Sequence, residues 1–301
     1  MLVVTASLAW LYLDARRPLQ DSFDSRTGQL TGSTVLEMSG DAEQASELML
    51  LRADSGLQVT LRVIREIAAE KKLPVLLILG GHRTGSDAAS LFGDVGERAV
   101  VALDYPYTGP EKVRGILPVA RTIPLARQAF RDTPPAVSLV LDWLLQQSWV
   151  DPAQVVIVGA SLGVPFATLA AARDARIRGA ILVHGAADNE LWLKAQVARR
   201  TSLKILHKPF AVLLHWLAYG PTFDTRRNIA LIAPRPVLIV GAREDERTPA
   251  GQTELLYAAA GQPKWLRWTE GAHVDPDHAQ VINELLQIAD EMLPFPGHTY
   301  R

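Results

Sequence analysis

The sequence contains no cysteine, and this absence excludes several kinds of chemistry at once. Disulfide bonds, thiolate zinc sites, a cysteine nucleophile and lipid attachment through cysteine all require a thiol. The phosphate-binding patterns G-x-G-x-x-G and G-x-x-x-x-G-K-[ST] are also missing, so a nucleotide cradle is not expected. The 31 basic and 32 acidic residues nearly cancel, and no basic run interleaved with aromatic residues marks a surface for nucleic acid.

Short apolar runs separated by helix-length amphipathic segments make up most of the chain. The runs are apolar on both faces, as a parallel sheet covered by helices requires, and they occupy residues 73–81, 98–106, 155–161, 179–187, 235–242 and 264–274. Helices are expected near residues 134–147, 167–177, 251–261 and 278–293. Upstream, SELMLLRA and LQVTLRVIRE flank DSG, which predicts an antiparallel hairpin. The pattern predicts an α/β fold.

Two parts of the chain depart from this alternation. Residues 1–45 comprise an apolar segment and a lead-in rich in Asp, Ser, Thr and Gly, and we expect the lead-in to be irregular. Residues 46–301 form the α/β domain. Within it, residues 188–229 make the connection between two strands longer than one crossover needs, which predicts an inserted helical cap.

The first segment, MLVVTASLAWLYLDARR, fits no targeting template. Residues 2–13 are apolar, yet a membrane span needs ~20 residues, and neither a basic region nor a small-residue cleavage site frames a signal peptide. Two interpretations remain open. One is the tail of a membrane anchor that starts upstream, with Arg16 and Arg17 at the interface, in a membrane-tethered or periplasmic protein. The other is a packed amphipathic helix in a cytoplasmic protein.

The stretch VVIVGASLGVPFATLAAA places one serine where a buried strand turns into a helix. The pattern Gly159-Ala160-Ser161-Leu162-Gly163 is a G-x-S-x-G elbow. In such an elbow the serine takes a strained backbone geometry, and side chains at the glycine positions would collide with the neighbouring strand and helix. The amide of Leu162 and the positive end of the helix would then favour an oxyanion beside Ser161. The alternative is that Ser161 only caps the helix.

A serine nucleophile needs an imidazole to take its proton and a carboxylate to orient that imidazole. Both residue types follow at later strand ends, in GAREDERTP and EGAHVDPDH. His273 is the predicted base and His278 the runner-up, whereas His184 follows the wrong strand. The acidic residues at positions 244 to 246 are the candidate partners of the imidazole.

The motifs GASLG, GAREDERTP and EGAHV, in this order, resemble the α/β-hydrolase superfamily over about residues 57 to 293. The resemblance implies an eight-stranded, mostly parallel sheet, hydrolytic acyl transfer in a catalytic domain, and a cap after the sixth strand. In the superfamily pattern an aspartate is followed four positions later by proline, and Asp245 with Pro249 matches. Glu244 and Glu246 are then expected to be solvated loop charges. Esterases of the dienelactone hydrolase and acetyl xylan esterase kind are the most similar.

The resemblance also places a second oxyanion donor in the loop after residues 73–81. Aligning Gly80-Gly81 with the usual His-Gly pair makes the amide of His82 that donor, although the local sequence departs from the common HGGG form. A glycine-rich turn without a catalytic amide is the alternative, as is substrate binding through the side chains of His82 and Arg83.

We therefore expect a serine hydrolase that cleaves small-molecule carboxylic esters through an acyl-enzyme on Ser161, His273 and Asp245, with no metal or cofactor. If the cap lies over the serine, Trp192 and Trp216 would line an apolar substrate pocket. A peptidase or acyltransferase on the same triad remains an alternative. From another class, a degenerate hydrolase fold serving as a membrane-tethered binding protein remains open.

Overall fold

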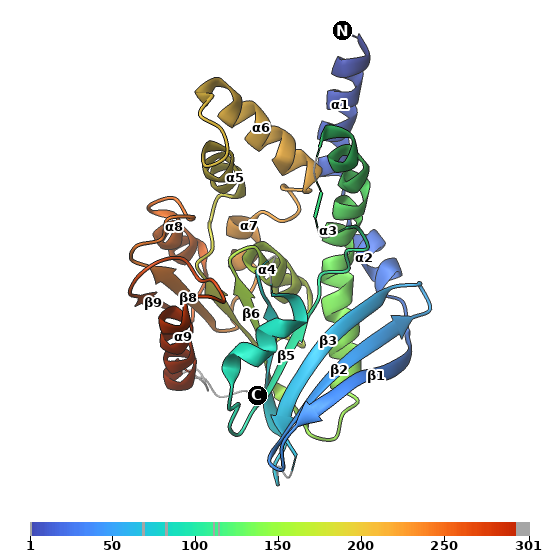
Figure 1. Ribbon diagram of the computed structural model, residues 1–301, viewed down its shortest axis with the longest axis vertical. Coiled ribbons are helices and arrows are strands. Elements are labelled where there is room, and N and C mark those ends of the chain that lie inside the picture. Colours follow the sequence, from blue (N-terminus) through green and yellow to red (C-terminus); the bar gives the residue numbers. More distant parts are fainter. Residues whose placement is uncertain (1, 68–69, 82–83, 111, 114, 293–301) are drawn as a thin grey trace.

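The computed structural model describes residues 2–67, 70–81, 84–110, 112–113 and 115–292, and one sheet runs through them (Figure 1). Its strand order is β1-β2-β3-β5-β4-β6-β7-β8-β9. The strands are β1 (Leu30–Gly40), β2 (Gln44–Ala53), β3 (Gln58–Glu66), β4 (Leu73–Leu79), β5 (Ala99–Leu103), β6 (Val150–Ala160), β7 (Gly179–Val183), β8 (Val237–Ala242) and β9 (Lys264–Thr269). β1 to β3 are antiparallel, and β4 to β9 are parallel to one another. The predicted mostly parallel α/β sheet is confirmed.

The helices cover both faces of this sheet (Figure 1). They are α1 (Leu2–Arg16), α2 (Gln20–Thr27), the 3₁₀ helix η1 (Gly85–Phe92), α3 (Ile116–Leu144), α4 (Gly163–Arg173), α5 (Asn189–Ala198), α6 (Lys204–Leu217), α7 (Thr225–Ala230), α8 (Gln252–Ala259) and α9 (Ala279–Met292). α3 begins well before the predicted start at Pro134. Arg127 lies in the first half of α3, where it pairs with Asp14 of α1 and donates to the carbonyl of Leu217. These contacts from outside the helix support its first half.

The described sheet has nine strands rather than the eight expected, and the extra strand is β1. The lead-in expected to be irregular instead forms α2 and β1. Almost every side chain of β1 is exposed, while its backbone pairs with β2 from Leu30 to Gly40. A strand with both faces exposed to solvent has no alternation of apolar and polar residues, because only its backbone is paired. The sequence pattern therefore could not predict β1.

Alternate residues of β6 enter two different cores, which explains why its sequence is continuously apolar. Val155 and Ile157 join the large core beneath α3 and α4. Val156 and Val158 face the opposite side, where the packing partners are α9 and η1. The second side holds fewer buried side chains than the first, and it contains the cavity described below.

α5, α6 and α7 lie in the long connection between β7 and β8, and all their residues except Ala230 fall in the segment 188–229 for which a cap is predicted. α5 and α6 stand above the sheet in Figure 1 and pack against each other. The first residue of this segment, Asp188, accepts a hydrogen bond from the amide of Leu191 (2.9 Å), which is the cap of α5. The division of the chain into a lead-in, a catalytic domain and a cap remains a prediction.

α1 joins the rest of the molecule through its last turns. Leu11 and Ala15 are buried there, and the ring of Tyr12 packs edge-on against Trp216 of α6, with centroids 5.3 Å apart. The side chain of Trp10 is 63% exposed. Among the described residues, no helix combines the length and apolar character needed to cross a membrane.

Candidate active site

The turn from β6 to α4 holds Ser161 in a strained backbone conformation, with φ at 53°. A Cβ atom on Gly163 would collide with the carbonyl oxygen of Leu79 in β4, and one on Gly159 would lie 2.6 Å from the Cβ of Ala167 in α4. Both glycines are therefore required by close approach, one to the neighbouring strand and one to the helix. These close approaches are the ones that the elbow pattern predicts for its two glycines.

The side chains of Ser161, His273 and Asp245 form one hydrogen-bonded chain. Nε2 of His273 lies 2.7 Å from Oγ of Ser161, and its Nδ1 lies 2.9 Å from each carboxylate oxygen of Asp245. Because the carboxylate accepts the proton on Nδ1, the lone pair of Nε2 is free to accept the serine proton. Helix α4 is preceded by Leu162 without any side-chain cap, so the alternative role of Ser161 as a helix cap does not hold.

The carboxylate of Asp245 is kept charged by its partners. Its Oδ1 also accepts the backbone N–H groups of Arg247 (2.8 Å) and Thr248 (2.7 Å). Burial would raise the pKa of Asp245, but the hydrogen bonds from His273 and from the two amides outweigh burial and hold the pKa below its usual value. An ionised carboxylate therefore faces the imidazole at neutral pH.

The two neighbouring glutamates differ from each other. Glu244 is exposed, as expected of a solvated loop charge. Glu246 is exposed too, yet its Oε2 accepts the backbone N–H of His273 (3.0 Å), and its Oε1 pairs with Arg247. The expectation that Glu246 is only a solvated charge is wrong, because its carboxylate holds the loop that carries the imidazole. Burial raises the pKa of Glu246 and the hydrogen bond from His273 lowers it, with a net lowering.

His184, at the end of β7, connects the loops of the acid and the base. It is fully buried and has a positive φ of 52°. Its Nδ1 accepts the backbone N–H of Val274 (2.8 Å), next to His273, while its carbonyl accepts the hydroxyl of Thr248 (3.1 Å), beside Asp245. Burial, followed by repulsion from His273, lowers the pKa of His184 to about 4, so the ring is neutral and can accept at Nδ1.

From the sequence, His184 is not the expected base because it follows the wrong strand for the order serine, acid, histidine. The feature of the sequence that could have pointed to His184 is its position directly after an apolar strand, because functional side chains gather at the carboxyl ends of parallel strands. The hydrogen bond to Val274 depends on tertiary structure that no local pattern encodes.

His184, Asp245 and His273 offer ligand atoms within 4.8 Å of one another, a spacing that a metal ion could use. Nδ1 of His184 is occupied by the amide of Val274, and the other two side chains bond to each other. The hydrogen bonds therefore account for the cluster without an ion.

The oxyanion donors are described in part. Leu162 immediately precedes α4, so its amide lies at the positive end of that helix, beside Ser161. His82 and Arg83 lie outside the described residues. The segment before them is fixed, because the hydroxyl of Tyr105 donates to the carbonyl of Gly80 (2.7 Å).

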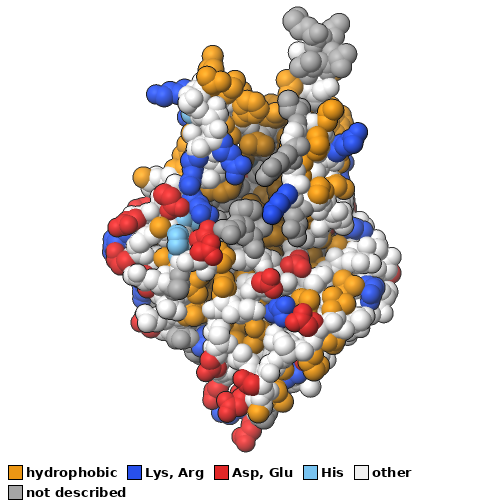
Figure 2. Space-filling model, viewed as in Figure 1, with side chains coloured by type: hydrophobic (Ala, Val, Ile, Leu, Met, Phe, Trp, Pro, Cys, Tyr) orange, Lys and Arg blue, Asp and Glu red, His pale blue; other side chains and the backbone are white. Residues whose placement is uncertain are grey.

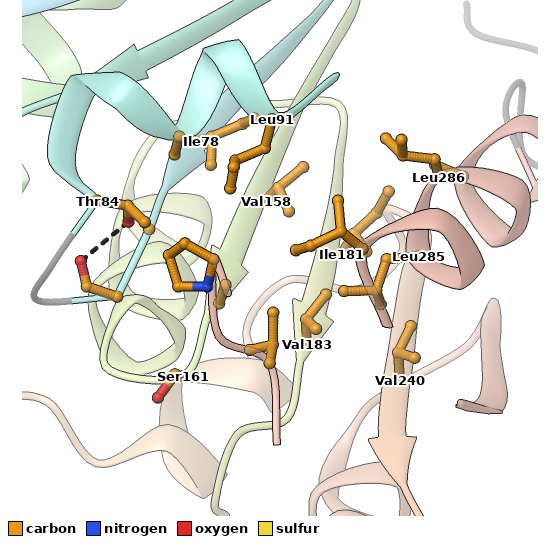
Figure 3. A pocket seen from close by; sticks show the side chains of 18 of the residues that line it. Ile78, Thr84, Leu91, Val158, Ser161, Ile181, Val183, Val240, Leu285 and Leu286 are labelled. Atoms are coloured by element: carbon orange, nitrogen blue, oxygen red, sulfur yellow. Dashed lines mark hydrogen bonds between the residues drawn. The ribbon is translucent and has the colours of Figure 1, made fainter. Parts of the chain in front are cut away.

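An apolar cavity of about 120 Å³ begins beside Ser161 and passes between η1 and α9 (Figure 3). Its wall is made of aliphatic side chains from four strands and both helices: Ile78, Leu91, Val158, Ile181, Val183, Val240, Leu285 and Leu286. Near Ser161 the wall also includes Thr84 and Arg247. Arg247 pairs there with the buried Asp275 (3.0 Å), which joins the two loops of the triad a further time.

Trp192 and Trp216 do not line this cavity. The ring of Trp216 packs against Tyr12, and its backbone carbonyl accepts from Arg127. The apolar space next to the serine is thus made by the sheet, η1 and α9 rather than by the cap, and a pocket under the cap stays a prediction.

Comparison with known proteins supports the fold. The sequence model of the prolyl oligopeptidase family matches residues 133–265, which include Ser161 and Asp245. No curated protein sequence matches the chain. Many solved structures share the fold, among them two acetyl xylan esterases and a glucuronoyl esterase.

The acetyl xylan esterase from Paenibacillus sp. R4 is 16% identical, with a TM-score of 0.65 over 89% of this chain and 92% of that one. The enzyme from Thermoanaerobacterium sp. JW/SL YS485 is 17% identical, with a TM-score of 0.61 over 88% and 91%. The glucuronoyl esterase from Solibacter usitatus is 15% identical, with a TM-score of 0.56 over 91% and 92%. Together with the elbow and the sheet order, these similarities show that the chain has the α/β-hydrolase fold.

Proposed function

We propose that this α/β-hydrolase is a serine esterase that cleaves carboxylic esters of small molecules. The observation that carries the proposal is the hydrogen-bonded chain from Ser161 through His273 to Asp245, with the serine on a strained elbow at a helix N-terminus. This arrangement supplies a nucleophile, a base and an orienting carboxylate in the geometry that acyl transfer requires. The acetyl xylan and glucuronoyl esterases of similar fold are consistent with an ester substrate.

In the proposed reaction, Oγ of Ser161 attacks the ester carbonyl while Nε2 of His273 takes its proton. The oxyanion that forms is stabilised by the amide of Leu162 and by a second donor, predicted to be His82. His273 then gives its proton to the leaving alkoxide, and the acyl group remains on the serine. Water, activated by the same imidazole, hydrolyses the acyl-enzyme and restores the free hydroxyl.

The cavity between η1 and α9 would receive the acyl group. It is lined by Ser161 and Val274, whereas His273, which must face the departing alcohol, is not among its described lining residues. The acyl chain therefore extends from the carbonyl carbon into the cavity. A volume of about 120 Å³ is slightly smaller than the ~150 Å³ of an engineered cavity that holds benzene, so an acyl group of about four to six carbons fits.

Labelling with a fluorophosphonate and turnover of p-nitrophenyl esters test the proposal together. Labelling should occur on Ser161, and a series of acyl lengths should give saturable hydrolysis with a maximum at about four to six carbons. Ser161→Ala is the matched control for both readouts. A folded protein that neither reacts with the probe nor hydrolyses any ester of the series would favour the binding-protein alternative and overturn the proposal.

A peptidase is the second candidate, and the match to the prolyl oligopeptidase family is the observation that favours it. The same triad would cleave amides if the leaving amine is positioned for protonation by His273. Esters and p-nitroanilides with the same acyl group separate the two functions. The esterase proposal expects the ester to be turned over far faster than its uncatalysed rate, with no detectable release of p-nitroaniline.

A further inference from the structure

One end of the molecule exposes large apolar side chains from three segments that are far apart in the sequence. Leu13 of α1 is 66% exposed, Leu117 near the start of α3 is 73% exposed, and Ile205 of α6 is 82% exposed. Other exposed side chains of the same helices are Trp10, Val119, Phe210 and Leu214. Apolar atoms accordingly gather at the upper end in Figure 2, where Figure 1 places α1, α6 and the beginning of α3.

The three segments are joined rather than independent. Tyr12 of α1 packs on Trp216 of α6, and Arg127 of α3 pairs with Asp14 of α1. A concentration of exposed aliphatic side chains is unfavourable in water. A single exposed leucine is common on protein surfaces, whereas a patch formed by several elements indicates an interaction surface.

Basic residues predominate on these helices, although Asp188, Glu190 and Asp224 lie near His215 in the last turn of α6. Residues 191 to 223 contain Lys194, Arg199, Arg200, Lys204 and Lys208 and no acidic residue. Arg16 and Arg17 end α1, whose single acidic residue, Asp14, faces inward to Arg127. By contrast, the opposite end carries acidic side chains, with Asp41, Glu43, Glu66, Asp94 and Glu97 around one groove.

We propose that this apolar and basic end, formed by α1, the start of α3 and α6, binds the surface of an anionic lipid bilayer. Apolar side chains flanked by Lys and Arg suit the interface, where the former enter the acyl boundary and the latter meet lipid phosphates. A second copy of the chain is a poorer occupant, because a symmetric contact would bring two basic faces together. The molecule then lies on the membrane with its acidic end in water.

Vesicle co-sedimentation with the full chain tests the proposal. The protein should sediment with vesicles of equal parts phosphatidylcholine and phosphatidylglycerol, more weakly with phosphatidylcholine alone, and less at high salt. Ile205→Asp combined with Leu117→Asp should weaken the partition at least tenfold, by the loss of two buried side chains and the repulsion of two new charges. Lys204→Glu with Lys208→Glu should weaken only the binding to the anionic vesicles.

Ile67→Asp is the matched control, because Ile67 is 50% exposed and follows Glu66, which lines the acidic groove at the opposite end. It should sediment as the unchanged protein does, and circular dichroism with thermal melting should show that every variant is folded. Binding to neither vesicle would overturn the proposal. Binding that survives both double variants would confine the lipid contact to α1 and overturn the three-segment surface. Dimers in sedimentation velocity that the Ile205 and Leu117 changes dissolve would assign the surface to a second copy instead.

Discussion

The two sides of Ser161 differ in the forces that build them. The side of His273 is built by hydrogen bonds. The imidazole of His273 bonds to Asp245, the backbone N–H of His273 donates to Glu246, and the backbone N–H of Val274 donates to His184. On the other side lies a cavity whose wall is almost entirely aliphatic. Hydrogen bonds require one geometry, whereas aliphatic packing tolerates many, so the first side should control rate and the second should control which acyl group is accepted.

The largest effect expected is that of Ser161→Ala. It removes the nucleophile while leaving both sides of the site in place. Turnover of an ester should fall by about 10⁴ to 10⁶-fold, by analogy with other triad deletions, with thermal stability nearly retained. Stopped assays with burst analysis would measure it, and activity near that of the unchanged protein would refute the nucleophile.

The next largest effect is expected for Asp245→Asn. The asparagine keeps the shape of the side chain but changes which nitrogen of His273 carries the proton. An amide group donating to Nδ1 would leave the proton on Nε2, so the imidazole could not accept the serine proton. We expect kcat to fall by up to ~10⁴-fold. Glu244→Gln, in an exposed neighbour with no contact to the imidazole, is the control and should stay within about threefold. If the control were the crippling change, the acid would have been misassigned.

His184 separates positioning from chemistry, because it touches neither the nucleophile nor the substrate space. His184→Asn places an amide oxygen where Nδ1 accepts the amide of Val274, whereas His184→Gln does not. The glutamine variant should lose about 10 to 100-fold in kcat/KM through kcat, and the asparagine variant should recover most of that loss. The positive φ of residue 184 costs glutamine stability, which would appear in the melting temperature rather than in the turnover of the folded protein.

The same residue makes stability depend on pH. Its pKa of about 4 lies below the ordinary value of 6.5, so between these values the unfolded chain binds a proton that the folded chain does not. The free energy of unfolding should therefore fall as pH drops from 6.5 to 4, by on the order of 3 kcal/mol from this group. Urea unfolding at several pH values measures the slope. In His184→Asn this contribution should vanish, and an unchanged slope would contradict it.

The apolar side should show itself in selectivity. Val158 lies on β6, three residues before Ser161, and faces the cavity. Val158→Phe fills the space, so the ratio of kcat/KM for p-nitrophenyl hexanoate to that for the acetate should fall about tenfold. Leu255→Phe, at a 44% exposed position of α8, adds the same bulk outside the cavity and should leave the ratio unchanged. A shift with alcohol length instead of acyl length would assign the cavity to the leaving group.

The same contrast explains what the sequence could predict. The parallel strands, the hairpin and the elbow follow from periodicity and from glycines that only close approach explains, as at Gly163. The strand ends predict that the loop of residues 244–246 meets His273, whereas the choice of Asp245 within it comes from the resemblance to the superfamily pattern; the structure pairs Asp245 with His273. β1, by contrast, has mostly exposed side chains and is held mainly by backbone pairing with β2, and the cavity is formed by side chains of η1, α9 and four strands that lie far apart in the sequence. Such gaps depend on three-dimensional packing and have no local pattern.

The smallest effect concerns Glu246, the outermost member of the polar side. Its carboxylate accepts the amide of His273 from an exposed position, so solvent weakens the bond and water can replace it in part. Glu246→Gln retains an oxygen acceptor and should keep kcat within about threefold, while Glu246→Ala removes the acceptor and should cost up to about tenfold. If both variants matched the unchanged enzyme, the bond to the His273 amide would not matter and the rate-controlling side would end at Asp245 and His184. If glutamine were as damaging as alanine, the charge rather than the hydrogen bond would be what the imidazole needs.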